Sequence, residues 1–237
     1  DVYKRQIQLS AERIRRRYGK VITEDREVFD QCTDTIIRQV ADIGRMVDEF
    51  SSFARMPKPT LTAGDLRETI REASLLLKVS HPEIQFDEDL GEQELVARFD
   101  SRLMGQAFGN LIKNACEAME GVEFSDDEKP TIRIATSLVG DMYQIDIVDN
   151  GKGLPKENRQ RLLEPYMTTR EKGTGLGLAI VGKILEEHGG RIELMDAPQV
   201  SEGGHGALMR VCLPVLDTSE QQDGDGEVVV EGATGGI

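Results

Sequence analysis

The chain has 237 residues, 38% of them hydrophobic and 30% charged, which is typical of a soluble globular protein with one large or two modest domains. Its formal net charge of −14 argues against a nucleic-acid partner, because phosphate backbones bind basic surfaces. No segment reaches the roughly 18 apolar residues of a membrane span. The three cysteines lack CxxC spacing, so neither disulfides nor a zinc site is indicated. We expect a reduced, cytoplasmic chain, with any membrane anchor in regions upstream of this sequence.

The N-terminal quarter carries two helical patterns, one over residues 7–18 and one from about residue 23 to residue 56. In the second pattern, apolar residues recur with heptad spacing: Phe29, Ile36, Val40, Ile43, Val47, Phe50 and Ala54. Such a seam is typical of a coiled coil or a four-helix bundle. Because two helices cannot fill a bundle, we expect a homodimer through this helical hairpin. The alternative is a hairpin packed on its own domain.

After Pro57 and Pro59, which end the second helix, the pattern becomes mixed. Helices are expected over 65–79, 101–119 and 176–188, and strands over 83–90, 94–100, 191–196 and 207–214, with a hairpin over 131–151. The predicted fold is α+β, with one sheet covered on one face by three helices. The predicted domains are 1–57, 58–216 and an acidic, Gly-rich, disordered tail over 217–237.

The helix expected over 101–119 has a polar stripe, with Gln106, Asn110 and Asn114 spaced four residues apart on one face. A solvated helix surface explains such a stripe equally well. Asn is, however, a poor residue for a helix interior, and two of them in "GNLIKNA" call for a reason. A carboxamide oxygen suits Mg²⁺, which takes few protein ligands and completes its shell with water and substrate phosphates.

The sequence "DNGKG" follows the second strand of the predicted hairpin and begins with Asp149. Asp-Asn-Gly is common in turns, so a simple turn is one explanation. The other is a recognition site, in which a buried carboxylate accepts a hydrogen bond from an exocyclic amine. Gly151 and Gly153 would then let a flat ring approach the backbone.

The stretch "EKGTGLGLAIVGKILEEHGG" places Gly173, Gly175 and Gly177 directly before a helical pattern. It is not a P-loop, because Ile184 stands where a hydroxyl must reach Mg²⁺. A glycine loop that ends at a helix N-terminus near Leu176 would still present free N–H groups to a phosphate. A glycine hinge is compatible with the same pattern.

Taken together, the order and spacing of these motifs resemble the catalytic domain of sensor histidine kinases. "NLIKNACEAM" resembles its N box, "DNGKG" its first glycine box, "EPYMTTR" its F box and "GTGLGLAI" its second glycine box. The helical hairpin resembles the dimerisation and phosphotransfer domain, and "GGHGALMRVCLP" the closing strand region. The likeness covers residues 7–216 and is strongest to NtrY-type nitrogen-regulation kinases. It implies an α/β sandwich of the gyrase, histidine kinase and MutL type.

The resemblance also implies the cofactors, ATP and Mg²⁺, and roles for matching positions. Asp149 would bind the adenine amine in a pocket shaped by Gly151 and Gly153, and Asn114 would ligate Mg²⁺. Asn110 would lie beside the phosphates, and Lys113 would assist. Residues 152–175 would form a mobile lid. The phosphates would meet the backbone of a glycine segment, namely Gly173, Thr174, Gly175, Leu176 and Gly177.

The implied reaction is phosphorylation of a histidine by ATP, followed by transfer to an aspartate on a response regulator, NtrX-like by resemblance. Relatives that hydrolyse ATP have a glutamate at the position of Asn110, and Asn cannot take a proton from water. A hydrolysing ATPase and a non-catalytic dimeric scaffold are the alternative functions. His81, His188 and His205 do not match the family's acceptor histidine. We therefore expect that the chain begins just after the acceptor histidine and cannot phosphorylate itself on the family site. Whether residues 1–6 belong to the native protein stays open.

Overall fold

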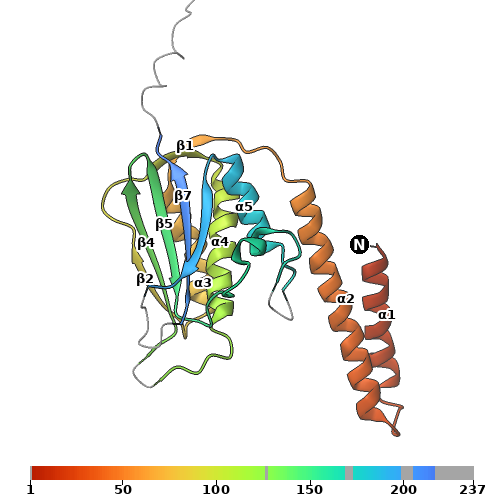
Figure 1. The fold of residues 1–237 in the computed structure, drawn as a ribbon. Coiled ribbons are helices and arrows are strands. Elements are labelled where there is room, and N and C mark those ends of the chain that lie inside the picture. Colours follow the sequence, from red (N-terminus) through yellow and green to blue (C-terminus); the bar gives the residue numbers. More distant parts are fainter. Residues whose placement is uncertain (1, 126–127, 169–172, 199–204, 217–237) are drawn as a thin grey trace, which may run out of the picture. The chain divides into compact units, whose positions relative to one another are not determined.

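The structure is a computed structural model that describes residues 2–125, 128–168, 173–198 and 205–216 (Figure 1). The chain forms two compact units. The first unit contains residues 1–58 and 154–184, and the second contains residues 59–153 and 185–237. The domain limits expected from the sequence stay a prediction, and the expected tail over 217–237 lies outside the described residues.

In the first unit, α1 (Val2–Tyr18) and α2 (Arg26–Ala54) form the expected helical hairpin (Figure 1). α1 begins five residues before the predicted start at residue 7. Ala11 and Thr33 are each 5% exposed, and they mark the buried part of the hairpin. Several heptad residues of α2 are instead left on the surface, with exposed fractions of 46% for Ile36, 58% for Ile43 and 46% for Phe50.

The first unit also contains the short 3₁₀ helix η1 (Arg159–Leu163) and most of α5 (Gly177–Glu187). Sequence patterns did not predict η1. α5 confirms the helix expected there, and Gly182 and Lys183 lie inside it as ordinary helical residues. Its last residues, from Leu185, belong to the second unit.

The second unit is built on a five-stranded sheet with the order β2-β4-β5-β7-β6 (Figure 1). The strands are β2 (Gln85–Asp89), β4 (Thr131–Val139), β5 (Met142–Asp149), β6 (Arg191–Asp196) and β7 (Ala207–Pro214). β4 and β5 form the predicted hairpin, in which Ile134 pairs with Ile147. β2 runs parallel to β4, whereas the other neighbours are antiparallel.

Two helices of this unit, α3 (Leu66–Ser80) and α4 (Ser101–Ala118), pack against each other and cover one face of the sheet (Figure 1). Both begin at an aspartate cap: the Asp65 carboxylate accepts from the N–H of Arg67, and the Asp100 carboxylate from that of Leu103. Leu103 on the apolar face of α4 and Ile145 of β5 are both fully buried. Burial of each such side chain stabilises the fold by about 1.5–3 kcal/mol.

The expectation of a single sheet was wrong. The strand expected over 94–100 is β3 (Val96–Phe99), which pairs with β1 (Thr62–Asp65) in a separate two-stranded sheet. The physical reason is that Asp65 both caps α3 and accepts a hydrogen bond from the N–H of Leu95, which holds β3 beside β1. No helix within the described part of the chain is long and apolar enough to cross a membrane.

Candidate nucleotide-binding site

The polar stripe expected on α4 is present. Gln106, Asn110 and Asn114 are half-buried and share one face of the helix. Lys113 is exposed instead, and its ammonium lies 3.7 Å from the carboxylate of Glu117 one turn later. This face of α4 therefore presents three carboxamides, rather than a charged group, from a partly buried position.

Asp149 stands at the end of β5 and is only 1% exposed. One oxygen of its carboxylate accepts hydrogen bonds from the N–H groups of Gly151, at 2.9 Å, and Ala207, at 3.3 Å. A buried carboxylate needs such donors, because an unpaired buried charge is costly. These donors fix the carboxylate at the tip of β5.

Asn150 supports this tip in a way that the sequence motif did not reveal. Its side-chain oxygen accepts from the N–H of Thr131, at 2.8 Å, and its amide nitrogen donates to the carbonyl of Lys129, at 2.8 Å. Asn150 is 3% exposed, so these bonds satisfy a buried amide. The residue therefore ties the end of β5 to the start of β4.

The loop after Asp149 packs against the C-terminal end of α4. The N–H of Lys152 donates to the carbonyl of Ala118, at 3.0 Å. A Cβ atom on Gly151 would lie 2.6 Å from the same carbonyl oxygen, so only glycine fits there. Since Asn114 lies one turn before Ala118, the structure brings the polar face of α4 and the tip of β5 to the same end of the second unit.

The glycine segment belongs to the first unit. Gly175 has a φ of +69°, and a Cβ there would lie 2.6 Å from the backbone of Tyr166. The N–H of Tyr166 donates to the carbonyl of Gly175, at 3.1 Å. Gly177 is the first residue of α5, which confirms that the glycine loop ends at a helix N-terminus. Residues 169–172 of the expected lid over 152–175 lie outside the described residues.

Within the first unit, two side chains of α2 contact Thr174 of this segment and Tyr166, which is bonded to it, and sequence patterns predicted neither contact. The hydroxyl of Thr174 donates to the carboxylate of Glu49. The rings of Phe50 and Tyr166 stack with their centroids 6.3 Å apart and an interplanar angle of 27°. Neighbouring residues of α2 thus contact Thr174 of the glycine segment and Tyr166, whose N–H donates to Gly175.

None of the three histidines is in α1 or α2. His81 is the residue after α3, with its Nδ1 atom 3.2 Å from the carboxylate of Glu83. His188 follows α5 and is 5% exposed, and its Nε2 atom accepts a hydrogen bond from the N–H of Asp100, at 3.0 Å.

The expected site residues therefore fall into two groups, each described within its own unit. The second unit contains Asn110, Lys113, Asn114, Asp149, Gly151 and Gly153, and the first contains Gly173, Thr174, Gly175, Leu176 and Gly177. Within the described residues, no cluster of three or more His, Cys, Asp or Glu side chains could hold a metal ion. A metal would depend on carboxamide oxygens such as that of Asn114 and on ligands from a substrate.

Comparison with known proteins identifies the family. Residues 99–217 match the family described as histidine kinase-, DNA gyrase B- and HSP90-like ATPases. The chain belongs to this family. It is 60% identical over 207 residues to the nitrogen regulation protein NtrY of Azorhizobium caulinodans, which places it among the NtrY-type histidine kinases. The match covers 87% of this chain but only 26% of that relative's length.

Solved structures of histidine kinases share the fold. The histidine kinase ThkA in complex with the response regulator TrrA has a TM-score of 0.64 at 22% identity, covering 90% of this chain and 59% of that chain. Full-length ShkA in complex with AMPPNP has a TM-score of 0.62 at 19% identity, covering 89% and 46%. The predicted fold class, a helical hairpin followed by an ATPase-type α/β sandwich, is confirmed.

Proposed function

We propose that this chain is the ATP-binding kinase part of a sensor histidine kinase. The observation that carries the proposal is Asp149, a carboxylate that is 1% exposed and held by backbone N–H groups at the end of β5. A fixed, buried carboxylate can accept a hydrogen bond from the amine of adenine, which distinguishes adenine from guanine. Family membership and the AMPPNP bound to ShkA support the same assignment.

The triphosphate would bind with Mg²⁺. Asn114 would supply a carboxamide ligand to the metal, and Asn110 would lie beside the phosphates. The N-terminus of α5 and the glycine segment before it would offer N–H groups and the positive end of the helix dipole. In this arrangement Mg²⁺ neutralises phosphate charge when it is bound, which eases the transfer of the γ-phosphoryl group.

Phosphoryl transfer then depends mainly on positioning and charge neutralisation. A carboxylate that activates water would favour hydrolysis, and Asn110 has no such group. We therefore infer that the domain holds ATP for transfer to a histidine, and from there to an aspartate on an NtrX-like response regulator. ThkA in complex with TrrA is a related kinase with its regulator.

The acceptor histidine would come from outside this sequence, because α1 and α2 contain no histidine. The exposed heptad residues of α2, such as Ile36 and Ile43, would pack against a second copy of the hairpin. A dimeric four-helix bundle buries this seam, whereas a single hairpin leaves it in water.

Titration calorimetry with ATP and Mg²⁺ tests nucleotide binding. Asp149→Asn should weaken binding at least tenfold, about 1.4 kcal/mol, because Asn would turn an N–H toward the adenine amine. Asp146→Asn is the matched control on the same strand, since the Asp146 carboxylate is already paired with Arg210 at 2.7 Å. Equal affinity of both variants and wild type, or no binding at all, would reject the proposal.

Incubation with radiolabelled ATP tests the inferred missing acceptor. The chain alone should gain no acid-labile phosphate, and it should label an added histidine-containing hairpin of an NtrY-type kinase. Acid-labile phosphate on this chain alone would show that one of its own histidines accepts, against the proposal. If ATP is turned over without any acceptor, and Asn110→Ala does so at the same rate as wild type, the hydrolysing ATPase would be favoured.

A further inference from the structure

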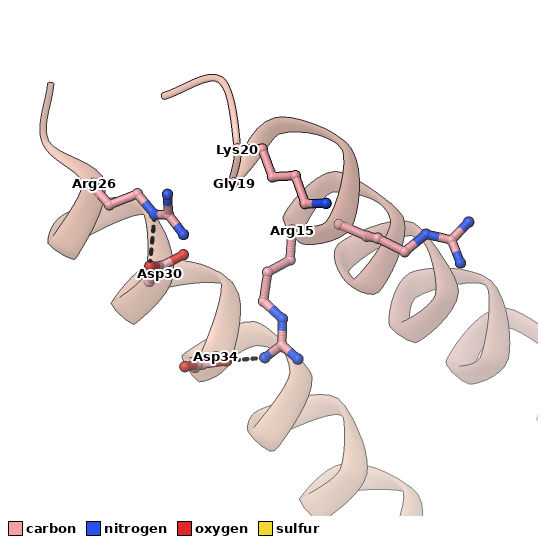
Figure 2. Close-up of a pocket in the computed structure, with 7 residues that line it drawn as sticks. Arg15, Gly19, Lys20, Arg26, Asp30 and Asp34 are labelled. Carbon is pink, nitrogen blue, oxygen red and sulfur yellow. Dashed lines mark hydrogen bonds and ion pairs between the residues drawn. The ribbon is translucent and has the colours of Figure 1, made fainter. Parts of the chain in front are cut away.

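A groove at the tip of the helical hairpin lies between the end of α1, the turn that follows it and the start of α2 (Figure 2). Its volume is about 410 Å³. It is lined by four cations, Arg15, Arg16, Lys20 and Arg26, and by two carboxylates, Asp30 and Asp34. All of these residues belong to the first unit, and none is part of the heptad seam of α2. The groove therefore carries an excess of two positive charges in a chain whose net charge is −14.

The two carboxylates orient two of the guanidinium groups without using all of their donors. Arg15 donates to Asp34 through Nη1, and Arg26 donates to Asp30 through Nε, at 3.1 Å (Figure 2). A guanidinium has five N–H donors, so each group keeps donors for a further acceptor. Both pairs are exposed, and exposed ion pairs contribute little to stability. The pairs therefore position the guanidiniums in the groove more than they stabilise the hairpin.

The other two cations of the groove, Arg16 and Lys20, form no ion pair with any residue that the structure describes. Arg16 is in the last turn of α1, and Lys20 follows four residues later in the turn between the helices. Both are exposed. Like charges at this spacing near a helix end repel each other and oppose the local fold. These two residues account for the excess positive charge of the groove.

Helix dipoles do not explain why these cations gather here. The negative end of α1 favours cations, which accounts for Arg15 and Arg16 in its last turn. Arg26, however, is the first residue of α2, where the positive end of the dipole disfavours a cation. Lys20 lies outside both helices. Cations from two helices and a turn thus meet in one groove, against the preference of the second helix.

The turn between the helices contributes backbone as well as the Lys20 side chain. Gly19 also lines the groove. A Cβ atom on Gly19 would lie 2.5 Å from the carbonyl oxygen of Arg15, so only glycine fits the turn. Because glycine adds no side chain to the wall of the groove, the four cations surround a space that a small anion can enter.

We propose that this groove binds the phosphate group of a phosphomonoester. Such a group carries a charge of about −1.5 to −2 at neutral pH, which matches the excess positive charge of the groove. Its oxygens accept hydrogen bonds from several directions, the planar fork of Arg fits phosphate geometry, and Lys adds a point charge. A bound phosphate contacts side chains from both helices. It therefore holds α1 and α2 together at the tip and relieves the repulsion between Arg16 and Lys20.

Nuclear magnetic resonance of the full, ¹⁵N-labelled chain tests this site. The probe is glycerol 3-phosphate, added at neutral pH with the ionic strength held at about 0.1 M, where charges more than about 10 Å apart are screened. The backbone N–H of Gly19 and the Nε–H of Arg26 report on the groove, and both should shift along one saturating binding curve. The N–H of Gly175 reports separately on phosphate binding at the proposed nucleotide site. Absence of a saturating shift at Gly19 would overturn the proposal, whatever Gly175 does.

Two matched double variants separate the groove from net charge. Arg16→Gln with Lys20→Gln should weaken binding at Gly19 by about tenfold or more, because it removes two charged donors. Arg13→Gln with Arg17→Gln removes the same charge, also from two exposed positions four residues apart near the end of α1, but neither residue lines the groove. This control should bind as wild type does. Circular dichroism checks that both variants keep their helices, and equal weakening in the two variants would overturn the proposal.

A second arm identifies the source of the phosphate group. Phosphatidic acid carries the same glycerol phosphate as the soluble probe, but at a membrane surface. Co-sedimentation of the full chain with vesicles of phosphatidic acid in neutral lipid, lost in the variant of Arg16 and Lys20, would assign the phosphate to a lipid headgroup. A saturating shift at Gly19 without co-sedimentation would assign it to a soluble phosphate ester.

Discussion

Gly206 lies so close to the backbone of Asp149 that a Cβ atom on residue 206 would be 2.0 Å from the Asp149 carbonyl oxygen. Gly206 also has a φ of +126°, a conformation that side chains rarely adopt. The next residue, Ala207, donates its N–H to the Asp149 carboxylate. The position of that carboxylate therefore depends on a glycine far along the chain.

We expect Gly206→Ala to lower the free energy of unfolding by about 3 kcal/mol or more, through steric overlap and backbone strain. It should also weaken ATP binding, because Ala207 would lose its place beside Asp149. Urea denaturation and calorimetry check both effects. Gly109→Ala is the control, since a Cβ there would meet no atom within 4 Å apart from its chain neighbours and its own helix backbone, and Ala favours a helix. If Gly206→Ala is as stable as Gly109→Ala, the close approach does not matter.

The hydrogen bond between Glu49 and Thr174 places a carboxylate beside the glycine segment proposed for phosphates. Glu49→Gln keeps a side-chain acceptor for the Thr174 hydroxyl and removes the negative charge. We expect about fivefold tighter ATP binding, on the order of 1 kcal/mol, and a smaller gain at high salt. Asp42→Asn on the same helix, where Asp42 pairs with Arg45, should change little. Unchanged or weaker binding by Glu49→Gln would mean that the charge does not oppose the nucleotide.

The stability of the fold should fall in alkaline solution through a buried thiol of α4. Burial raises the pKa of Cys116 from its ordinary value of 9.0 to about 11. Between these values the unfolded chain has lost the thiol proton and the folded chain retains it. The unfolded state therefore binds fewer protons, and the free energy of unfolding falls as pH rises from 9 to 11. Below pH 9 the Cys116 thiol is protonated in both states, so its contribution to the free energy of unfolding is fully present.

Urea denaturation at pH 8, 9.5 and 10.5 measures this loss. Cys116→Ala should begin less stable because of the cavity, and its stability should fall less steeply with pH than that of wild type. Cys32→Ala replaces an exposed thiol and should keep the wild-type slope. A Cys116→Ala slope equal to that of wild type would contradict the assignment.

His188 should stabilise the second unit by accepting the hydrogen bond of the Asp100 N–H, which begins α4. His188→Leu leaves that buried N–H without an acceptor and should cost about 1–3 kcal/mol. His188→Gln supplies an amide oxygen and should recover part of the loss. Thermal unfolding measures both variants. Equal losses for Leu and Gln would show that ring packing, and not the hydrogen bond, matters at this position.

Elements that depend on local pattern could be predicted from the sequence. The hairpin helices, α3 with its Asp65 cap, α4, and the β4–β5 hairpin follow from periodicity and capping residues that lie within a few positions of each other. The tip of β5 was also predictable, because Asp149 ends an alternating strand and is followed by glycines.

Features that depend on distant residues could not be predicted in this way. β1 has four residues and no alternation, and it exists only because β3 pairs with it. The hydrogen bond between the Asp100 N–H and His188 joins residues 88 positions apart, so no local pattern indicates it. The contacts of Glu49 with Thr174 and of Phe50 with Tyr166 likewise join parts of the chain that no short-range pattern connects.

The order of strands has a consequence for how this chain can be made. β7 is the last strand in the described part of the chain, yet it lies inside the sheet between β5 and β6. Until residue 214 is available, β6 has no partner and β5 exposes an open edge, which is a surface prone to pairing with other chains. This five-stranded sheet must therefore close only after β7 has been synthesised, and a chain cut short before Pro214 should aggregate rather than fold.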